Sequence, residues 1–419
     1  MYIVKKTSHA NQKALGGEPS IKHSAIGTRI FILAALLGAA TFILSPRSHA
    51  GAAAQCSNEN PILIGDVSSL SGSLQFPESA QAAKLVFGAL NLRCGIKGRR
   101  IDYQVLDDAG EPEKARALTA QLIDRGAVAL VGGTSVVSCG VNAELYKNKP
   151  IASIPGTGTG PRCFDSTNIA PPNSGLFSIT TLALKFAEQY LRPKKLCLVG
   201  NAHPSIPGNF QVPVESFHRM SGKSATIVNQ ELRPDTDPAP VLMQLQQAGC
   251  DVAFVGTLGQ FAARTSLALA KSEDRRLKLI FAPEAYTSEF VARLDPVLSG
   301  RIYVVTDTDF FDSKKPGMRR ARNRLESGGV ELSPFAVSGE LAAQILIDAL
   351  ERVKGPISRE SVLAELMSAG SYNTQGLTAS PYKFAWPENE RFAPGVHVVV
   401  FKNRSWGHAT DKWIILKQL

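Results

Sequence analysis

The sequence predicts an α/β protein built as two similar lobes, each a parallel-type sheet flanked by helices, joined by a multi-strand hinge. Three observations predict this fold. Short apolar runs alternate with longer amphipathic stretches from Pro61 onward, the alternation occurs twice in succession, and the last third of the chain departs from it. Strands that alternate with helices of about 10–15 residues are typical of βαβ units and a parallel sheet.

The first run of the alternation predicts one lobe. Helices are expected over 79–92, 111–126 and 138–148, with Pro112 well placed in a first helical turn. The short apolar runs between them predict strands over 62–64, 101–106, 128–131 and 151–154.

The second run predicts the other lobe by the same pattern. Helices are expected over 181–191, 212–221, 240–248 and 260–271. Strands are expected over 196–199, 225–228, 252–255 and 277–281.

The last third of the chain predicts a return to both lobes. It contains an expected strand over 302–305, helices over 315–327, 335–354 and 358–367, and strands over 382–385, 396–401 and 413–416. A chain that crosses between lobes more than once implies a hinge with a ligand cleft beside it. We expect lobe 1 to comprise 57–179 plus 308–376, and lobe 2 to comprise 180–307 plus 377–419.

The first fifty residues precede the fold. Basic residues come before an apolar run over 30–44, and small residues follow it. This order is typical of a secretory signal peptide, with cleavage expected after Ala50 or Ala54. A retained membrane anchor is the alternative, but a spanning helix needs about 20 apolar residues and this run ends before Pro46. We assign 1–50 as a signal peptide and expect an exported, periplasmic protein.

Charge and length exclude some classes of protein. Without residues 1–50 the net charge falls from +10 to +5, and the remaining basic residues are spread along the chain. Such a spread is a solvated surface, so no nucleic-acid partner is expected. The remainder of the 419-residue chain is longer than one core usually supports, which favours two domains.

Several local motifs occur in a fixed order along the chain. They are Ile64-Gly65, Ser69-Leu70-Ser71-Gly72, Asp107-Asp108, Val131-Gly132-Gly133-Thr134-Ser135, Ile154-Pro155-Gly156-Thr157 and Ala282-Pro283-Glu284. In this order they resemble the periplasmic leucine/isoleucine/valine-binding proteins and the wider group of type I solute-binding proteins, over about residues 61–416.

The resemblance implies the type I periplasmic binding protein fold and a role in transport. Such a protein would bind an amino acid, branched-chain or a related apolar or aromatic one, in the cleft between its lobes. It would then deliver this ligand to the permease and ATPase of an ABC importer. The resemblance also implies a monomer with no catalytic residues, no cofactor and no metal.

An α-amino acid carries a carboxylate and an ammonium group on one carbon, so its site needs donors and an anion on opposite walls. Ser135 lies where a strand ends and a helix begins, and helix N-termini favour anions. Gly156, Thr157 and Gly158 follow the next strand at its carboxyl end, where ligands bind in open α/β sheets. The resemblance implies a carboxylate cradle made of the Ser135 and Thr157 hydroxyls and the backbone of both glycines. The alternative is a serine cap and a glycine turn that serve the backbone alone.

Glu284 is the expected partner of the ligand's ammonium group. It follows the strand expected over 277–281 in lobe 2, and the resemblance places a carboxylate there. A half-buried anion is costly without a partner, and an ammonium supplies one. Without the resemblance, Glu284 would be a helix cap or a surface charge. Phe76 and Leu258 lie where the family's side-chain walls differ from this sequence, and both suit an apolar or aromatic group.

All six cysteines lie beyond residue 50, and an even count in an exported protein makes disulfides plausible. The predicted topology favours Cys56–Cys94, because both residues are expected at the same end of lobe 1. It also favours Cys139–Cys163, because these residues follow neighbouring strands on the cleft side. For Cys197 and Cys250 the sequence leaves both a disulfide and buried free thiols open, because both residues fall in or beside apolar strand runs.

Two rival functions remain open. An exported α/β enzyme would need a nucleotide-binding, phosphate-binding or nucleophile motif, and neither 132–133 nor 156–160 provides the required glycine spacing. A ligand-sensing ectodomain or envelope regulator of the same fold would need a retained anchor or a signalling domain.

Overall fold

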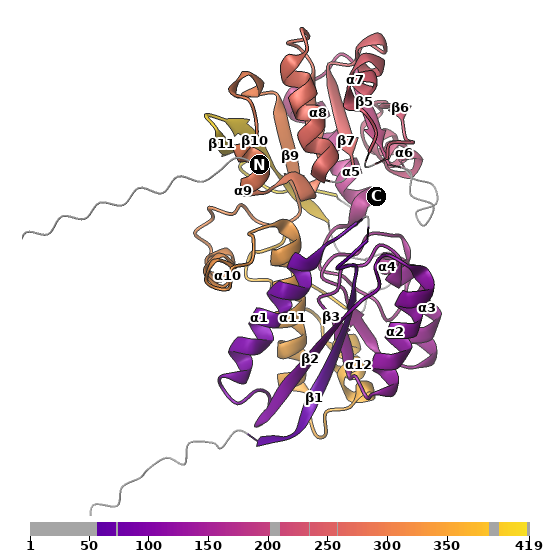
Figure 1. The fold of residues 1–419 in the computed structure, drawn as a ribbon, viewed down its shortest axis with the longest axis vertical. Coiled ribbons are helices and arrows are strands. Elements are labelled where there is room, and N and C mark those ends of the chain that lie inside the picture. The colour runs from indigo at the N-terminus through magenta and orange to yellow at the C-terminus, as the bar shows by residue number, and fades with distance from the viewer. Residues whose placement is uncertain are drawn as a thin grey trace, which may run out of the picture. The chain divides into compact units, whose positions relative to one another are not determined.

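The computed structural model describes residues 57–72, 74–201, 210–233, 235–257, 259–384 and 394–416. The expected signal peptide lies outside these residues. The described strands form two separate sheets (Figure 1). Among the described helices, none combines the length and the apolar character that crossing a membrane requires.

The first sheet is entirely parallel, with the strand order β2-β1-β3-β4. Its strands are β1 (Ser57–Ser68), β2 (Arg99–Asp107), β3 (Ala129–Val131) and β4 (Ala152–Ile154). Because β1 lies between β2 and β3, the carboxyl ends of β1 and β3 form a topological switch point, where open α/β sheets bind ligands.

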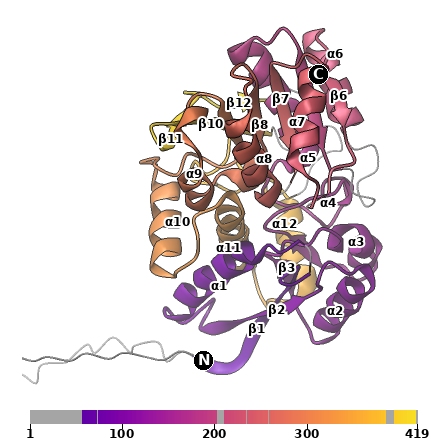
Figure 2. The same ribbon diagram turned by 45° about the horizontal axis from the view of Figure 1, so that its top comes forward.

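Helices cover both faces of the first sheet, with α1 and α11 on one side and α2 and α3 on the other in both views (Figures 1 and 2). The helices that pack in these cores are α1 (Pro77–Asn91), α2 (Pro112–Asp124), α3 (Ser138–Asn148), α4 (Arg162–Asp165), α10 (Pro316–Ser327), α11 (Pro334–Arg352) and α12 (Arg359–Ser368). Side chains of β1 alternate between the two faces as strand geometry requires: Ile62 and Ile64 pack with α1 and α11, whereas Leu63 packs with the α2 side.

The long helix α11 belongs to the first sheet although it comes late in the chain. Pro334 occupies its first turn, and the Ser333 hydroxyl accepts a hydrogen bond from the Ala336 N–H at 3.1 Å. This N-terminal cap fixes where the helix starts. Buried residues occur along most of the length of α11. The helix therefore packs within the core, in contact with α1, α10 and α12.

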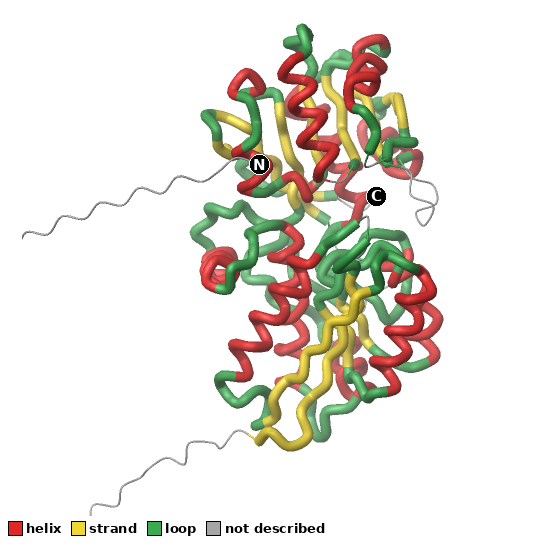
Figure 3. The backbone as a smooth tube through the Cα atoms, viewed as in Figure 1, coloured by secondary structure: helices red, strands yellow, loops and turns green. Residues whose placement is uncertain are grey.

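The second sheet has the strand order β11-β10-β9-β8-β7-β5-β6, and β12 also pairs with β10. Strands β5 to β9 run parallel to one another, and β10 pairs antiparallel with β9, β11 and β12. Figure 3 shows the strands of both sheets in yellow. The bounds are β5 (Leu196–Gly200), β6 (Thr226–Asn229), β7 (Val252–Gly256), β8 (Lys278–Phe281), β9 (Ile302–Thr306), β10 (Gly395–Lys402), β11 (Ser405–His408) and β12 (Ile414–Ile415). Strands β5, β7 and β9 are buried at every position, because helices cover both faces.

The remaining helical segments belong to the second sheet. They are α5 (Gly175–Phe186), a π-helical turn (Ala187–Leu191), α6 (Gln211–Ser221), α7 (Pro238–Gln247), α8 (Gly259–Lys271), a 3₁₀ turn (Pro283–Ala285), α9 (Ser288–Ala292) and a second 3₁₀ turn (Pro296–Leu298). Helices α5 and α6 pack against one face of the second sheet, and α7 and α8 pack against the opposite face.

The sequence predicted most of these elements, and it was wrong in the tail. Of the strand expected over 382–385, the structure has only an isolated bridge between Tyr382 and Tyr372, and residue 385 lies outside the described residues. The apolar pattern there reflects burial of an aromatic ring: the Tyr382 hydroxyl donates to the Ala170 carbonyl at 2.6 Å. Strand β11 and the short turns near α9 were not predicted.

The chain passes more than once between the core of the first sheet, which contains α1 and α11, and the core of the second sheet, which contains α5 and α6. Ala170 packs against the first core and Leu176 against the second, and later Val305 lies in the second and Met318 in the first. Tyr382 still packs in the first core, so a division after residue 384 fits the packing better than the expected division after residue 376. The assignment of residues to lobes stays a prediction.

The disulfides agree with the expected pairing where they are described. Cys139 is bonded to Cys163 with a Cα–Cα distance of 5.1 Å, and Cys197 is bonded to Cys250 with 5.9 Å. The second pair is the one that the sequence leaves less certain. Cys94 is also disulfide-bonded, and its expected partner, residue 56, lies outside the described residues, so that pairing stays a prediction.

Candidate ligand-binding site

A cavity of about 140 Å³ lies where loops from the two sheets meet. Every strand loop that reaches it leaves the carboxyl end of its strand: those after β1, β3 and β4 in the first sheet, and those after β5, β7, β8 and β9 in the second. The first turns of α5 and α11 complete the wall. This is the position that parallel topology assigns to a ligand, here supplied by both sheets together.

The cavity wall is mainly apolar. Phe76 and Phe335 form an edge-to-face pair with ring centroids 5.3 Å apart, and they stand beside other apolar residues of the wall. These are Leu74, Val136, Leu176 and Ile179. A dry apolar cavity of about 150 Å³ is large enough to bind benzene, so this one suits a single branched or aromatic group. A wider groove of about 690 Å³ adjoins the cavity and shares Phe76, Phe335 and Glu284 with it.

Four threonine hydroxyls on the cavity wall are buried and have no hydrogen-bond partner in the described part of the protein. They belong to Thr134, Thr157, Thr159 and Thr257. A buried hydroxyl without a partner costs roughly 1–3 kcal/mol, so polar atoms left in this state at a cavity suit a polar ligand. The sequence pointed to Thr157, but the other three were not predicted.

Glu284 lines the cavity from the 3₁₀ turn that follows β8. Burial raises the pKa of this carboxyl to about 8, its own backbone N–H lowers it in part, and the nearby Asp307 raises it further. Thr287, which follows this turn and caps α9, accepts a hydrogen bond from the Trp406 indole N–H through its carbonyl at 3.1 Å.

A second carboxylate, Asp307, reaches the cavity from the end of β9 and was not predicted. It is 4 % exposed, and burial raises its pKa. One carboxylate oxygen, Oδ2, accepts a hydrogen bond from the Ser174 N–H at 2.8 Å, which holds the side chain at the point where α5 begins. The rule that ligands gather at the carboxyl ends of parallel strands could have found it.

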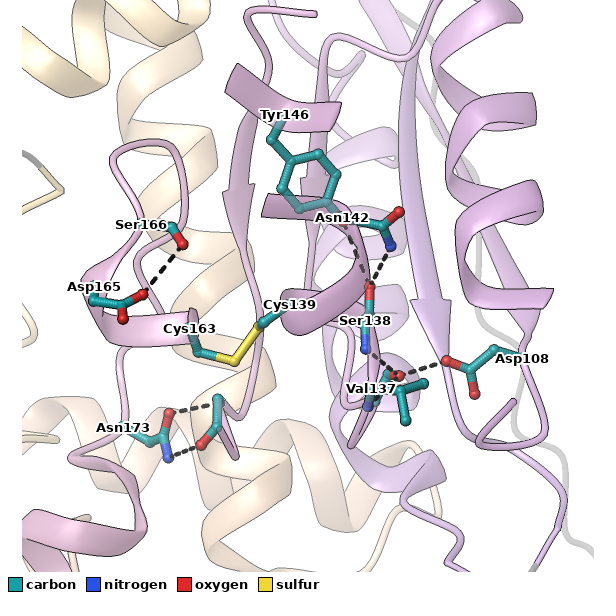
Figure 4. Close-up of a disulfide and its surroundings, with 12 residues drawn as sticks. Asp108, Val137, Ser138, Cys139, Asn142, Tyr146, Cys163, Asp165, Ser166 and Asn173 are labelled. Carbon is teal, nitrogen blue, oxygen red and sulfur yellow. Dashed lines mark hydrogen bonds between the residues drawn. A yellow bond between two sulfur atoms is a disulfide. The ribbon is translucent and has the colours of Figure 1, made fainter. Parts of the chain in front are cut away.

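Ser135 does not line this cavity, and its hydroxyl is fully engaged elsewhere. It donates to Asp108 Oδ2 and accepts from the N–H groups of Val137 and Ser138 at 3.3 and 3.0 Å. Figure 4 labels these three partners. Asp108 is itself completely buried and also bonds Ser69 and the Gly110 N–H. The serine therefore serves as a local cap, which was the alternative interpretation of the sequence. Its neighbours Thr134 and Val136 reach the cavity instead.

The glycines of the next loop are also occupied by internal bonds. The Gly156 N–H donates to the Gly133 carbonyl at 2.8 Å. The Gly158 N–H and carbonyl both pair with the side-chain amide of Asn173, which Figure 4 labels, at 2.7 and 3.0 Å. A Cβ at Gly156 would lie 1.8 Å from the Ser79 hydroxyl oxygen, so glycine is required there by close packing. Of the four expected carboxylate donors, the Thr157 hydroxyl remains unengaged.

The expected side-chain walls are partly described. Phe76 lines the cavity and is 7 % exposed. Leu258 lies outside the described residues, so its role stays a prediction. Its neighbour Thr257 lines the cavity, as does Gly256 at the end of β7.

The disulfide between Cys139 and Cys163 ties together the segments that follow β3 and β4 (Figure 4). Cys139 lies in the first turn of α3, and Cys163 lies in α4, just after the loop that carries Thr157 and Thr159. The bond therefore restrains two loops that reach the cavity relative to each other.

Two sheets whose parallel strands end at one shared cavity are the arrangement of a two-lobed solute-binding protein. The chain belongs to the periplasmic binding protein family, whose model matches residues 61–404. No curated protein matches the sequence.

Solved structures show the same fold at low sequence identity. A fatty acid ABC transporter substrate-binding protein from Thermomonospora curvata is 17% identical with a TM-score of 0.72, covering 87% of this chain and 93% of that one. A branched-chain amino acid ABC transporter from Thermus thermophilus with bound valine is 17% identical with a TM-score of 0.71, covering 85% and 97%. The branched-chain amino acid transporter substrate-binding protein LivJ from Streptococcus pneumoniae, in complex with isoleucine, is 16% identical with a TM-score of 0.70, covering 85% and 100%.

Proposed function

We propose that this protein is the extracytoplasmic substrate-binding component of an ABC importer and binds an amino acid or a close relative with an apolar or aromatic side chain. It would collect this solute in the periplasm and deliver it to a membrane permease driven by an ATPase. The protein would be exported by a cleavable signal peptide, would act as a monomer, and would carry out no reaction on its ligand.

One observation carries the proposal. Loops from both sheets line a small apolar cavity. Its wall also carries the Glu284 carboxyl group and the Thr157 hydroxyl, which has no partner among the described residues. The Glu284 carboxyl gains a charge-assisted partner when an ammonium group enters, while the phenyl rings of Phe76 and Phe335 take the apolar part of the ligand. Both lobes would then contact the same molecule, so the ligand favours the closed arrangement.

The relatives support a transport role and leave the ligand open. Two of the similar structures hold valine or isoleucine, and a third is described as a fatty acid binder. The same fold therefore serves solutes with different head groups, and the head group must be argued from this chain's own residues.

A thermal-shift screen of the exported protein tests the proposal. The panel contains the amino acids, their amides and alcohols, simple amines, and carboxylic acids with the same side chains. A ligand that binds only the folded state raises the melting temperature, and we expect the apolar members that carry an ammonium group to do so. A panel in which no amino acid or relative raises the melting temperature would contradict the proposal.

Glu284→Gln is the matched variant for this screen. It keeps the size of the side chain and should weaken binding of an ammonium ligand by about 2–4 kcal/mol, the scale for removing one partner of a buried charge pair. Glu326→Gln, at an exposed position on α10, is the control that should bind as the unaltered protein does. Unchanged affinity in Glu284→Gln by calorimetry would remove Glu284 from the site.

A further inference from the structure

The charges on the cavity wall do not match a zwitterion. Glu284 and Asp307 both line the cavity, and each raises the cost of a second negative charge there. Among the described residues of the wall there is no lysine, arginine or histidine. Neither carboxylate takes part in an ion pair with any described residue.

Three of the four donors expected to hold a ligand carboxylate are already in use, and only the Thr157 hydroxyl is not. The Ser135 hydroxyl bonds to Asp108, the Gly156 N–H bonds to a backbone carbonyl, and the Gly158 N–H bonds to Asn173. A carboxylate entering the cavity would find neutral threonine hydroxyls and would add a negative charge beside two acidic side chains, Glu284 and Asp307, whose pKa values are already raised. Like charges brought together in a dry site repel each other strongly, because the interior screens them poorly.

An ammonium group meets the opposite situation. Asp307 is held in place by the Ser174 N–H, and Glu284 is held by its 3₁₀ turn, so both carboxylates are positioned before any ligand arrives. The Thr134 hydroxyl is completely buried, faces the same cavity and lacks a partner among the described residues, so it can accept a hydrogen bond from the same ammonium group. The apolar wall takes the rest of the molecule.

We infer that the ligand carries a net positive charge: an apolar or aromatic amine, or an amino-acid derivative whose carboxylate is replaced by a neutral group, bound between Glu284 and Asp307. This inference rests on the proposed function of the cavity as the ligand site. It assigns to Asp307 a role in binding, and it excludes the free amino acid as the preferred solute.

Three compounds with the same isobutyl side chain test the charge directly. They are L-leucinol, which is a cation, L-leucine, which is a zwitterion, and 4-methylpentanoate, which is an anion. Their affinities are measured by calorimetry on the exported protein at one pH, and phenylalaninol, phenylalanine and 3-phenylpropanoate form a parallel aromatic series. We expect the cation of at least one series to bind tenfold or more tightly than its zwitterion, and the anions not to bind.

The outcomes separate this inference from the proposed function. Tighter binding of leucine or phenylalanine than of its alcohol overturns the net-charge inference and leaves an amino-acid-binding function standing. Tighter binding of the anions overturns both. If no member of either series binds, both proposals fail for apolar amines and amino acids alike.

Asp307→Asn tests the second carboxylate on its own. The substitution keeps an oxygen that can accept from the Ser174 N–H, so the fold should be retained, which a melting curve checks. We expect the cation to lose tenfold or more in affinity while the zwitterion loses less. Asp411→Asn, at an exposed position, is the control and should change neither. Equal affinity of Asp307→Asn and the unaltered protein for the cation would remove Asp307 from the site.

Discussion

At the scale of single residues, hydrogen-bond partners decide which side chains can meet a ligand. Ser135 and Thr157 follow neighbouring strands and carry the same chemical group, yet the first hydroxyl is held by Asp108 and the second has no partner among the described residues. The sequence could indicate both hydroxyls because strand ends gather at one edge of a sheet. It could not indicate that the Ser135 hydroxyl bonds to Asp108, which follows β2. That bond depends on the register of β2 against β1.

This difference predicts opposite effects for two substitutions. Thr157→Val removes an unpartnered hydroxyl and should weaken ligand binding by about 1–3 kcal/mol while leaving the stability of the free protein unchanged or slightly raised. Ser135→Ala leaves the buried Asp108 carboxylate short of a donor and should lower stability by about 1–3 kcal/mol with little effect on affinity. Calorimetry and denaturant unfolding of both variants check this, and an affinity loss in Ser135→Ala alone would reverse the assignment.

The pKa of Glu284 predicts a pH dependence of binding. Because this carboxyl has a pKa of about 8 in the free protein, it is largely protonated at pH 6, and a cationic ligand must displace that proton. Affinity for a simple amine such as 3-methylbutylamine should therefore rise about tenfold per pH unit from pH 6 to 7 and level off above about pH 8. The rise should be absent in Glu284→Gln. A flat profile in the unaltered protein would show that Glu284 does not change its protonation on binding.

At the scale of elements, the pattern of the sequence located strands and helices well because each keeps one buried face. The failures have physical causes. Tyr382 gave a strand-like pattern because its ring is buried in the first core. Asp307 was missed because its only signal is its position directly after a strand, and the strand-end rule was not applied to that strand. The close crossing of α1 and α11 was also invisible, since it depends on Gly339 facing the Ser79 carbonyl across the two helices.

That crossing yields a prediction about two helical glycines. A Cβ at Gly339 would lie 2.2 Å from the Ser79 carbonyl oxygen, so Gly339→Ala must move one helix and should destabilise the protein by about 1–3 kcal/mol. At Gly140, in α3, a Cβ would meet nothing within 4 Å, so Gly140→Ala should stabilise by roughly 0.5–1 kcal/mol through helix propensity. Denaturant unfolding compares the pair, and equal effects would show that α1 and α11 are not packed this closely.

At the scale of the whole molecule, the order of motifs indicated the two-sheet fold and the disulfide between Cys139 and Cys163, since both depend only on parallel topology. It did not indicate how the late segments join the cores. His397 on β10 is an example: it lies 3.6 Å from Asp309, in the segment that leads from β9 to α10, and against Trp413. These contacts join parts of the chain that are far apart in sequence.

His397 predicts an acid-sensitive stability. Burial lowers its pKa to about 4, although Asp309 opposes the shift, while Lys315 and His408 lower the pKa further. The unfolded chain therefore binds a proton below about pH 6.5 that the folded protein binds only near pH 4, and this difference costs stability as the pH falls through that window. His397→Gln should remove a loss on the order of 2 kcal/mol between pH 7 and about pH 4.5. Denaturant unfolding of both proteins at the two pH values measures it, and identical pH profiles would contradict the prediction.

The hydrogen bond from Trp406 to Thr287 has a practical consequence. The indole bonds Thr287 and packs against Tyr286, which directly follow the turn that carries Glu284, so we expect a movement of this segment to change the emission of Trp406. The protein therefore contains its own optical reporter. We expect the binding of a solute to change this emission, and stopped-flow tryptophan fluorescence with Trp406→Phe as the control would follow it in real time without labels.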